Sequence, residues 1–383
     1  MVRKGNILKA SRRLRMGMVG GGPGAFIGPV HRMAAELDGG IELVAGAFSS
    51  TLERSQAAGR RYGLAEDRVY ASYEAMILAE KSRPDPIDFV SIVTPNHLHL
   101  PGARAALQHG FPVISDKPAT ASLQEALELE SVVQSTGLPY ALTYTYTGYP
   151  MVRQARALCR EGALGSIRKV LVEYLQGWLS EPVELSGHKQ AGWRLDPAKA
   201  GIGGAIGDIG VHAFQIVEFV TGMQTTQLCA SLNSVIPHRQ LDDDCSILLT
   251  LDGAVPGVLL ASQIATGEGN GLRLRVYGEK GALDWQHELP NQLIVRHTGQ
   301  PAQVYSAGTD YLTVDAQKVT RLPVGHPEGL IEAFANIYRE FGDVVKSGGA
   351  LPDSLPGIRD GVRGMRFVQR SIESSRTRQW LAF

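Results

Sequence analysis

Three polar side chains in this sequence have the types and the setting needed to move a proton: Lys117, Asp208 and His212. Lys117 lies in the motif Asp116-Lys117-Pro118, directly after a short apolar run that predicts a buried strand. Asp208 and His212 are four residues apart where a helix is expected, so both would lie on one face of that helix. An acid and an imidazole placed in this way can tune each other for proton transfer. Each residue also has a plainer interpretation, as a solvated loop lysine, a helix cap and a half-buried imidazole, so the surrounding elements must decide.

A glycine-rich loop follows the first apolar strand of the chain. Gly20, Gly22 and Ala25 match the dinucleotide-binding pattern G-x-G-x-x-G/A, although the loop is long enough for Gly28 to be the third small residue instead. Small residues there let the chain turn, let the backbone meet a pyrophosphate and let a helix pack on the strand. The amides at the start of the next helix would then hold the phosphates. The alternative is an ordinary glycine-rich turn.

The end of the second expected strand, at residues 41–48, bears on the choice of cofactor. An acid at this point would bind the ribose hydroxyls of NAD, but the chain has Ser49, Ser50 and, one turn later, Arg54. Hydroxyls and a guanidinium suit a 2′-phosphate, so the cofactor is expected to be NAD or NADP, with a slight preference for NADP. The alternative is that the two serines only cap the next helix.

The first half of the chain alternates strands and helices, which is typical of a doubly wound parallel sheet. Lys117 would then leave a strand at its carboxyl end, where such sheets bind their ligands. His97 and His99 are two residues apart and do not share a helix face, so no metal site is expected. We predict a Rossmann NAD(P)-binding domain over residues 1–145, with further strands at 88–93, 111–115 and 139–144 and a helix at 122–135.

After residue 145 the pattern changes to strands with little helix between them. The sequence predicts an α+β domain over residues 146–383, with a large, mostly antiparallel open sheet for substrate binding and oligomerisation. The run at 257–264 has little polarity on either face, which favours a homodimer or homotetramer through the sheet. An amphipathic helix is expected at 328–345, and a last helix, about 358–374, is expected to pack back near the first domain. The other expected strands lie at 168–175, 226–231, 246–251, 272–277, 282–285 and 293–297.

The charge balance and the cysteines bear on the expected partners and cellular location of the protein. Lys+Arg and Asp+Glu both number 38, so no overall field favours nucleic acid or a membrane surface as a partner. The three cysteines are widely spaced, which favours reduced thiols in the cytoplasm. Ser11-Arg12-Arg13 faintly matches a twin-arginine export signal, but the apolar run after it leads directly into the glycine loop. A basic tail is the preferred interpretation.

Taken together, these motifs resemble the Gfo/Idh/MocA family of sugar and inositol dehydrogenases over nearly the whole chain. The resemblance rests on Gly20-Gly21-Gly22, on Thr94-Pro95-Asn96 with His99, on Asp116-Lys117-Pro118, and on Gly203-Gly204-Ala205 through Asp208 and His212. The chain departs from the family in having Asp116 where glutamate is usual and Gln215 where an acid is frequent. The second departure puts in doubt a role for that position in ordering a sugar.

The resemblance implies a nicotinamide in the cleft between the two domains and an enzyme that oxidises a secondary hydroxyl of a sugar, anhydrosugar or cyclitol. It implies that Lys117 contacts substrate and cofactor, and that His212 is the general acid/base with Asp208 beside it. Two alternatives stay open: an NAD-dependent glycoside hydrolase or lyase that acts by transient oxidation and elimination, and a dinucleotide-binding sensor without turnover. Further residues are implied at the cofactor, namely Thr94, Pro95, Asn96, His99 and Asp116, and at the substrate, namely Tyr149, Gln176, Trp193 and Arg194.

Overall fold

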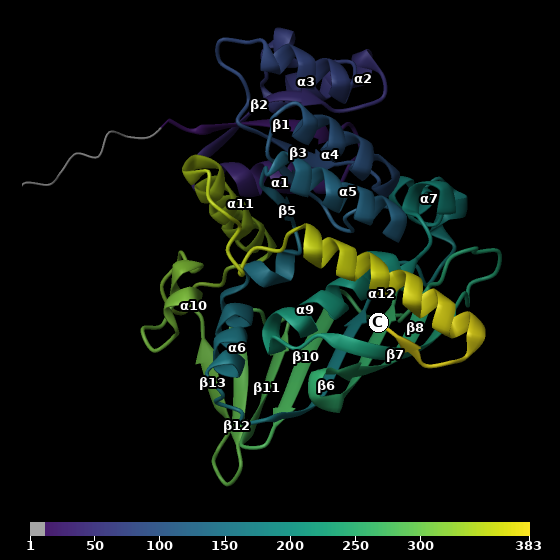
Figure 1. The fold of residues 1–383 in the computed structure, drawn as a ribbon, viewed down its shortest axis with the longest axis vertical. Coiled ribbons are helices and arrows are strands. Elements are labelled where there is room, and N and C mark those ends of the chain that lie inside the picture. The colour runs from purple at the N-terminus through teal and green to yellow at the C-terminus, as the bar shows by residue number, and fades with distance from the viewer. Residues whose placement is uncertain (1–11) are drawn as a thin grey trace, which may run out of the picture.

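The computed structural model describes residues 12–383 and shows two sheets joined by long helices (Figure 1). Most of the basic N-terminal stretch considered as an export signal or tail lies outside these residues. Arg12, the first described residue, donates two hydrogen bonds of 2.6 Å to the carboxylate of Asp88. Within residues 12–383, none of the helices is both long and apolar enough to cross a membrane.

The first sheet has five parallel strands in the order β2-β1-β3-β4-β5, which is the Rossmann arrangement predicted from the sequence. Its central strands are buried on both faces, as a parallel sheet between two layers of helices requires. The strands are β1 (Leu14–Gly20), β2 (Ile41–Ala47), β3 (Phe89–Val93), β4 (Val113–Ser115) and β5 (Tyr140–Leu142). The helices are α1 (Ile27–Glu36), α2 (Leu52–Tyr62), α3 (Tyr73–Lys81), α4 (His99–Gln108) and α5 (Leu123–Thr136), with short turns η1 (Glu66–Arg68) and η2 (Asn96–Leu98).

The second sheet has nine strands in the order β13-β12-β11-β10-β6-β9-β8-β7-β14. Only β6 and β9 pair in parallel, so the sheet is mostly antiparallel, as predicted. Two short edge strands, β13 and β14, were not predicted. The strands are β6 (Ile167–Leu175), β7 (Thr225–Asn233), β8 (Asp244–Leu251), β9 (Val255–Ser262), β10 (Gly271–Gly278), β11 (Gly281–Gln286), β12 (Gln292–His297), β13 (Gln303–Ser306) and β14 (Leu381–Ala382).

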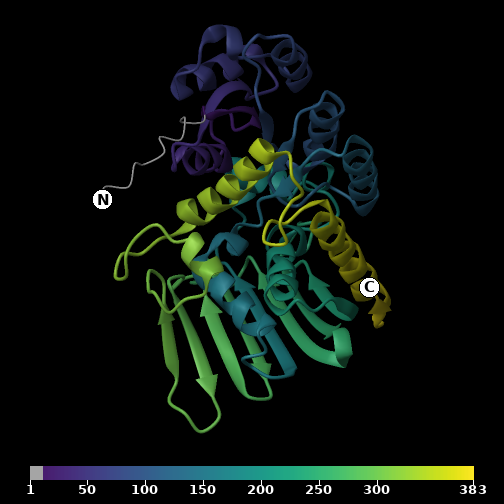
Figure 2. The same cartoon turned by 60° about the vertical axis from the view of Figure 1, so that its left-hand side comes forward.

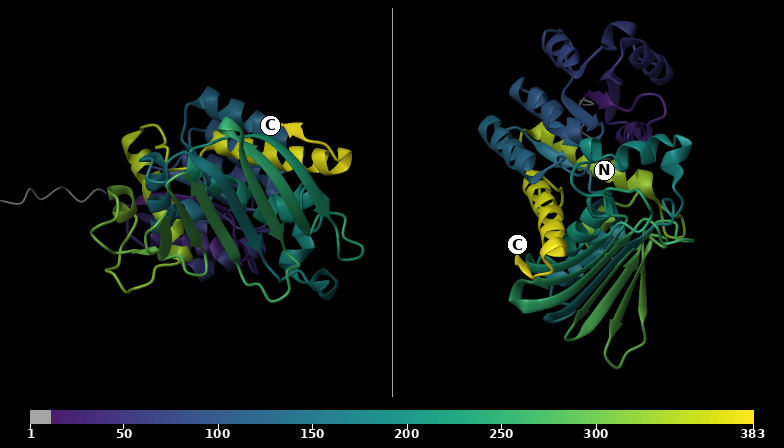
Figure 3. Two further views of the ribbon diagram at one scale, coloured as in Figure 1. Left: turned by 90° about the horizontal axis from the view of Figure 1, so that it is seen from below. Right: turned by 90° about the vertical axis from the view of Figure 1, so that its right-hand side faces the viewer.

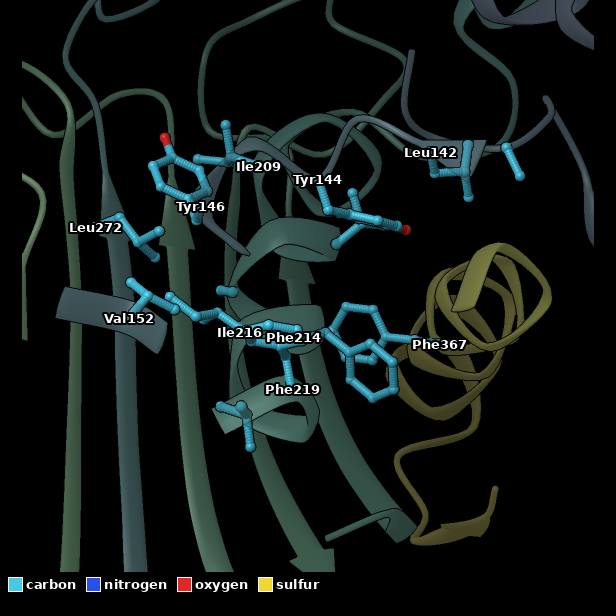
Figure 4. Packing of buried hydrophobic residues seen from close by; sticks show 14 of the residues in the cluster. Leu142, Tyr144, Tyr146, Val152, Ile209, Phe214, Ile216, Phe219, Leu272 and Phe367 are labelled. Atoms are coloured by element: carbon cyan, nitrogen blue, oxygen red, sulfur yellow. The ribbon is translucent and has the colours of Figure 1, made fainter. Parts of the chain in front are cut away.

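Helices cover one face of the second sheet. Figure 2 shows α6 (Pro150–Arg160) and α9 (Val211–Thr221) lying across its strands. Figure 4 shows Phe214 on α9 packed against Phe367 on α12 (Ile358–Thr377), with ring centroids 4.4 Å apart. Seen from below, the sheet lies in front of these helices (Figure 3, left). The remaining elements of this half are η3 (Thr145–Gly148), η4 (Val183–Ser186), α7 (Lys189–Arg194), α8 (Pro197–Ala200), η5 (Ile206–Gly210), η6 (Asp252–Ala254) and α10 (Val314–Lys318).

The two C-terminal helices lie at the junction of the two halves (Figure 1). The apolar face of α11 (Leu330–Ser347) packs on the first sheet, where Phe341 meets Phe89 with ring centroids 5.3 Å apart. Helix α12 contacts α5 of the first half and both β7 and α9 of the second. Each half of the chain therefore takes part of its core from a distant segment.

Helix α11 also contributes Tyr338 to a buried polar cluster with α1 and β3. His31 Nδ1 and Ser91 Oγ lie 2.7 and 2.8 Å from the hydroxyl of Tyr338. Burial lowers the pKa of His31 to about 4, against 6.5 for a free imidazole. The unfolded chain therefore binds more protons at His31 than the folded chain between these pH values, so the stability that His31 contributes is lost as the pH falls.

We expect this single site to lower the free energy of unfolding by about 2 kcal/mol between pH 7 and pH 5. Urea denaturation at the two pH values measures the change. In His31→Asn the pH-dependent loss should shrink by about that amount, whereas His326→Asn, which alters an exposed imidazole, should keep it. An unchanged pH dependence in His31→Asn would contradict the assignment.

Candidate active site

The glycine loop between β1 and α1 is shaped by close backbone approaches. A Cβ on Gly22 would lie 2.3 Å from the carbonyl oxygen of Phe48, at the end of β2. A Cβ on Gly28 would lie 2.3 Å from the Cα of Gly21, so Gly28 lets the helix pack on the loop. Gly28 does not line the cleft, and its position against Gly21 is the one described for the third small residue of the pattern, which lets the helix pack. Ala25 does line the cleft.

A cleft of about 770 Å³ runs from this loop to the second sheet. Residues of both halves of the chain form its walls, as the family resemblance implied for the cofactor and substrate. The sequence-predicted residues that line it are Gly20, Gly22, Ala25, Ser49, Ser50, Arg54, Thr94, Pro95, Asn96, Asp116, Lys117, Gln176, Trp193, Arg194, Asp208 and His212.

Asp208 is the centre of the polar contacts in the cleft. Lys117 Nζ donates to Asp208 Oδ1 at 3.0 Å and to its main-chain oxygen at 2.7 Å. Arg194 Nε and Gln263 Nε2 donate to Oδ2 at 3.2 and 2.9 Å. Burial opposes ionisation of Asp208, but the charges of Lys117 and Arg194 outweigh it and hold the pKa of this carboxyl well below its usual range. Asp208 is therefore an anion that anchors two cations.

Within the described residues, no hydrogen bond joins the carboxylate of Asp208 to His212. Asp208 lies in η5, a π-helical turn that precedes α9, so a plain i, i+4 helix face does not relate it to His212. Its carboxylate points to Lys117, Arg194 and Gln263 instead. Both residues line the same cleft, and the charge of Asp208 acts to raise the pKa of His212, against burial and Lys117, which lower it.

His212 sits among aromatic rings at the wall of the cleft. Its imidazole packs edge-on against Tyr146 and Tyr144, with centroids 5.0 and 5.8 Å away. Burial, together with the charge of Lys117, holds the pKa of His212 well below its usual value, so the ring is neutral at pH 7. Within residues 12–383, its buried Nδ1 has no hydrogen-bond partner. A neutral imidazole facing a cleft can accept a proton from a bound hydroxyl.

Polar groups from η3, from the end of β6 and the residue after it, and from the residue before β10 form the floor of the cleft beside His212. The hydroxyls of Tyr146 and Tyr174 lie 2.5 Å apart, and Tyr174 donates to Asn270 Oδ1 at 2.7 Å. The amide of Gln176 donates to the same oxygen at 2.7 Å. Tyr146, Tyr174 and Asn270 were not identified from the sequence, because single tyrosines and asparagines carry no distinctive spacing.

Tyr149 is not part of this floor, although the family resemblance placed it at the substrate. It is buried beneath the cleft, and its hydroxyl lies 3.0 Å from His287 Nε2. The reason is its place directly before α6, which packs its ring under that of Tyr146.

His99 is also withdrawn from the cleft. Its Nδ1 lies 2.7 Å from the carbonyl oxygen of Pro118, and its Nε2 lies 2.9 Å from that of Thr94. The buried ring therefore ties together the two loops that follow β3 and β4. Its expected contact with the cofactor is corrected to support of Thr94 and of the segment after Lys117.

Asp116 and Asn96 hold backbone as well as lining the cleft. Asp116 Oδ1 accepts from the main-chain N–H of Lys117 at 2.8 Å and from the hydroxyl of Thr143 at 3.1 Å. Asn96 Nδ2 donates to the carbonyl oxygen of Ala200 at 2.8 Å, which links the first half of the chain to α8. The carboxylate of Asp116 thus fixes the backbone that carries the side chain of Lys117.

Helix α7 closes one side of the cleft, and this helix was not predicted from the sequence. Lys189 Nζ donates to the carbonyl oxygen of Pro23 at 2.6 Å, and Gln190 Nε2 donates to that of Gly24 at 3.3 Å. Gln190 Oε1 in turn accepts from Arg194 Nη1 at 2.7 Å. A hydrogen-bonded path therefore joins the glycine loop to Arg194 and, through it, to Asp208.

Comparison with known proteins agrees with this fold. A family model described as "Oxidoreductase family, NAD-binding Rossmann fold" matches residues 14–144, and a model of the "GFO/IDH/MocA C-terminal domain" matches residues 152–284. The chain is 32% identical to the uncharacterized oxidoreductase YfiI of Bacillus subtilis, over 95% of each chain. It is 24% identical to levoglucosan dehydrogenase of Pseudarthrobacter phenanthrenivorans, over 97% of this chain and 98% of that enzyme.

Among solved structures, an inositol dehydrogenase homolog of Azotobacter vinelandii in complex with NAD+ gives a TM-score of 0.93 at 36% identity, covering 97% of this chain and 98% of that one. A structure of an inositol dehydrogenase homolog from the same organism with NADH and myo-inositol gives 0.90 at 35% identity, with the same coverage. The two family models together span most of the cleft-forming chain. The protein therefore belongs to the Gfo/Idh/MocA family of NAD-binding oxidoreductases.

Proposed function

We propose that this protein is an NAD(P)-dependent dehydrogenase that oxidises a secondary hydroxyl of a cyclitol, sugar or anhydrosugar. The observation that carries the proposal is the cluster of Lys117, Asp208 and His212 in a cleft that begins at the glycine loop. Its relatives include a homolog solved with NADH and myo-inositol and a levoglucosan dehydrogenase. Myo-inositol and levoglucosan both carry ring hydroxyls.

The residues at the glycine loop fit a dinucleotide. The backbone of Gly20 to Gly22 approaches its neighbours so closely that no side chain could be added at Gly22, and the amides of α1 begin beside it. Thr94, Pro95 and Asn96 would hold the nicotinamide ribose further along the cleft. When bound, the nicotinamide supplies a hydride acceptor for the alcohol carbon.

The protein's own groups supply the proton chemistry. His212, neutral at pH 7, accepts the proton of the substrate hydroxyl. The ammonium of Lys117 donates to the same oxygen and stabilises its developing negative charge. Asp208 holds that ammonium through two oxygens and so fixes its position in the cleft. Asp208 thus acts on the reaction through Lys117.

The remaining walls suit a polyhydroxylated ring. Trp193 offers an apolar face, and the guanidinium of Arg194 lies over it, 4.3 Å from the ring centroid. Gln176 and Asn270 line the floor and offer donors and acceptors to hydroxyls away from the reacting carbon. Such a site recognises a ring by its pattern of hydroxyls.

A spectrophotometric screen of inositols, aldoses and anhydrosugars with NAD+ and NADP+ tests the function. We expect reduced nicotinamide to accumulate with at least one of these polyols. If the cofactor stays bound and a glycoside is cleaved without net reduced nicotinamide, the elimination mechanism replaces the proposal. Tight binding of NAD(H) without turnover of any polyol would instead indicate a sensor.

The adenosine end of the cleft supports the slight preference for NADP. Ser49, Ser50 and Arg54 all line it, and Lys189 from α7 lies near enough for the charge of Arg54 to add to burial in lowering the Lys189 pKa. Two cations and two hydroxyls suit a 2′-phosphate. The solved homologs were bound to NAD+ or NADH, so both cofactors need to be compared.

Replacing Arg54 with alanine should therefore lower kcat/KM for NADP+ about tenfold, the cost of one partly exposed charge-assisted hydrogen bond. The value for NAD+ should stay within about twofold, because NAD+ has no phosphate at this point. Steady-state kinetics with both cofactors measure the ratio, and Arg61→Ala, on the same helix but outside the cleft, is the matched control. Equal losses with both cofactors would rule out a phosphate site here.

We also propose that the open face of the second sheet binds a second copy of the chain. Leu171, Val258 and Leu248 are direct cross-strand neighbours, and Leu248 is 49% exposed. This apolar row supports a homodimer or homotetramer, which light scattering on the purified protein would measure; a monomer at high concentration would refute it. A cytoplasmic location, expected from the cysteines, stays a prediction.

A further inference from the structure

Asp242, in the loop before β8, binds the backbone at the start of the segment that carries Asp208 and His212. Its Oδ1 accepts from the N–H of Gly204 and its Oδ2 from the N–H of Ile206, both at 2.7 Å. Its main-chain oxygen accepts from the intervening N–H of Ala205 at 2.8 Å. One residue therefore takes three successive backbone donors at the start of η5, two of them on a carboxylate.

The fit between the two segments is tight. A Cβ on Gly204 would lie 2.0 Å from the main-chain oxygen of Asp242, so only glycine permits this approach. Burial raises the pKa of Asp242 to about 6, although both backbone donors favour its ionised form. At neutral pH the carboxylate is ionised and accepts both hydrogen bonds.

We call the three contacts of Asp242 with residues 204–206 the Asp242 clamp. Short hydrogen-bonded paths connect this clamp to the reacting groups. The carbonyl oxygen of Gly204 accepts from the N–H of Asp208 at 2.9 Å, and the carbonyl oxygen of Asp208 accepts from Lys117. The next residue, Asp243, accepts through its main-chain oxygen from the N–H of Gln263 at 2.9 Å, and the side chain of Gln263 donates to Asp208. The loop at 242–243 is thus linked to Asp208 by two paths. One reaches the main chain of Asp208 through residue 204, and the other reaches the carboxylate of Asp208 through Gln263.

We propose that Asp242 is a positioning residue for the reaction: its carboxylate fixes the backbone at residues 204–206, which holds Asp208, and through it Lys117, opposite His212. The proposal rests on the proposed dehydrogenase function. Misplacing a reacting group by about 1 Å costs on the order of 10²-fold in rate. The loss of this clamp should therefore appear in kcat, because the glycine loop that binds the cofactor is formed by other residues.

The test compares Asp242→Asn and Asp242→Ser with the wild-type enzyme. Asparagine keeps the shape and one acceptor but turns an NH2 group toward a backbone donor, whereas serine keeps one shorter acceptor. We expect kcat to fall about 10- to 100-fold in Asp242→Asn, and at least as far in Asp242→Ser, with the dissociation constant for NADH within about twofold of wild type.

Asp360→Asn is the matched control. Asp360 is a half-buried carboxyl whose Oδ2 accepts from the N–H of Gly357 at 2.8 Å, so it caps α12, which carries none of the proposed reacting groups. The Asp360→Asn variant should lose about as much stability as Asp242→Asn, but its kcat should not fall. A kcat in Asp242→Asn within twofold of wild type, or an equal fall in Asp360→Asn, would overturn the positioning role.

Amide hydrogen exchange separates this proposal from the proposed function. In Asp242→Asn, exchange should rise in residues 204–212 and stay unchanged in the glycine loop, whether or not a substrate is known. A wild-type enzyme that turns over no polyol would contradict the proposed function, and the exchange result would still decide the clamp. Unchanged exchange across 204–212 would refute it.

Discussion

Replacing Lys117 with methionine is expected to lower kcat by about 10²–10³-fold, the cost of removing one donor to a developing oxyanion. Methionine keeps most of the stem but removes the ammonium that lies 3.0 Å from Asp208 Oδ1. Among the described residues, the variant leaves the half-buried carboxylate of Asp208 with Arg194 and Gln263 as its side-chain partners. Binding of NADH should change much less than kcat, because the glycine loop is untouched. Steady-state kinetics and a titration of NADH fluorescence measure the two quantities.

Lys199→Met is the matched control for this variant. Lys199 forms an exposed ion pair with Asp196 at 2.7 Å in α8, and such pairs contribute about 0–1 kcal/mol. Its kcat should stay near the wild-type value. Turnover by Lys117→Met at the wild-type rate would remove Lys117 from the chemistry.

Replacing His212 with asparagine is expected to lower kcat by about 10²–10⁴-fold, which is the range for loss of a general base. The pH dependence of kcat gives a second test of His212. Because burial and Lys117 hold the pKa of His212 well below its usual value, the wild-type base stays deprotonated as the pH falls through 6.5. The wild-type kcat should therefore show no fall near pH 6.5 that belongs to His212.

The control for this variant is His326→Asn, which alters an exposed imidazole outside the cleft. Its kcat and its pH profile should match the wild type. An acid limb near pH 6.5 in the wild type that disappears in His212→Asn would show that His212 titrates as a solvated imidazole, against the buried setting that the structure gives it.

Local patterns in the sequence were sufficient for most of the fold. The apolar strands around the glycine loop and before Lys117 are buried on both faces, so their continuous hydrophobic runs were distinctive. The strands β13 and β14 escaped because they are short edge strands, and exposed side chains such as Val304 give them no alternation. The π-helical turn η5 also has no sequence signature, so the widened turn around Asp208 was not predicted.

The site was only partly predictable, because its contacts join distant segments. Asp208 is 91 residues from Lys117 and 55 from Gln263 along the chain, and no spacing rule reports either contact. Local patterns pointed to Lys117 and His212, and the family resemblance gave them roles. The resemblance also placed Tyr149 and His99 at the ligands, and both are buried behind the cleft wall. Their burial follows from packing against neighbouring loops, which the sequence alone does not reveal.

The most direct test of the proposed reaction follows deuterium from a polyol to the cofactor. The substrate is whichever ring polyol the screen identifies, deuterated at every ring carbon and incubated with the enzyme and oxidised cofactor. We expect one deuterium in the reduced nicotinamide that is released and a ketone in the product, with the rate reduced in Lys117→Met and His212→Asn. Cleavage of a glycoside with the cofactor still bound, or product formation with no deuterium in released nicotinamide, would contradict it.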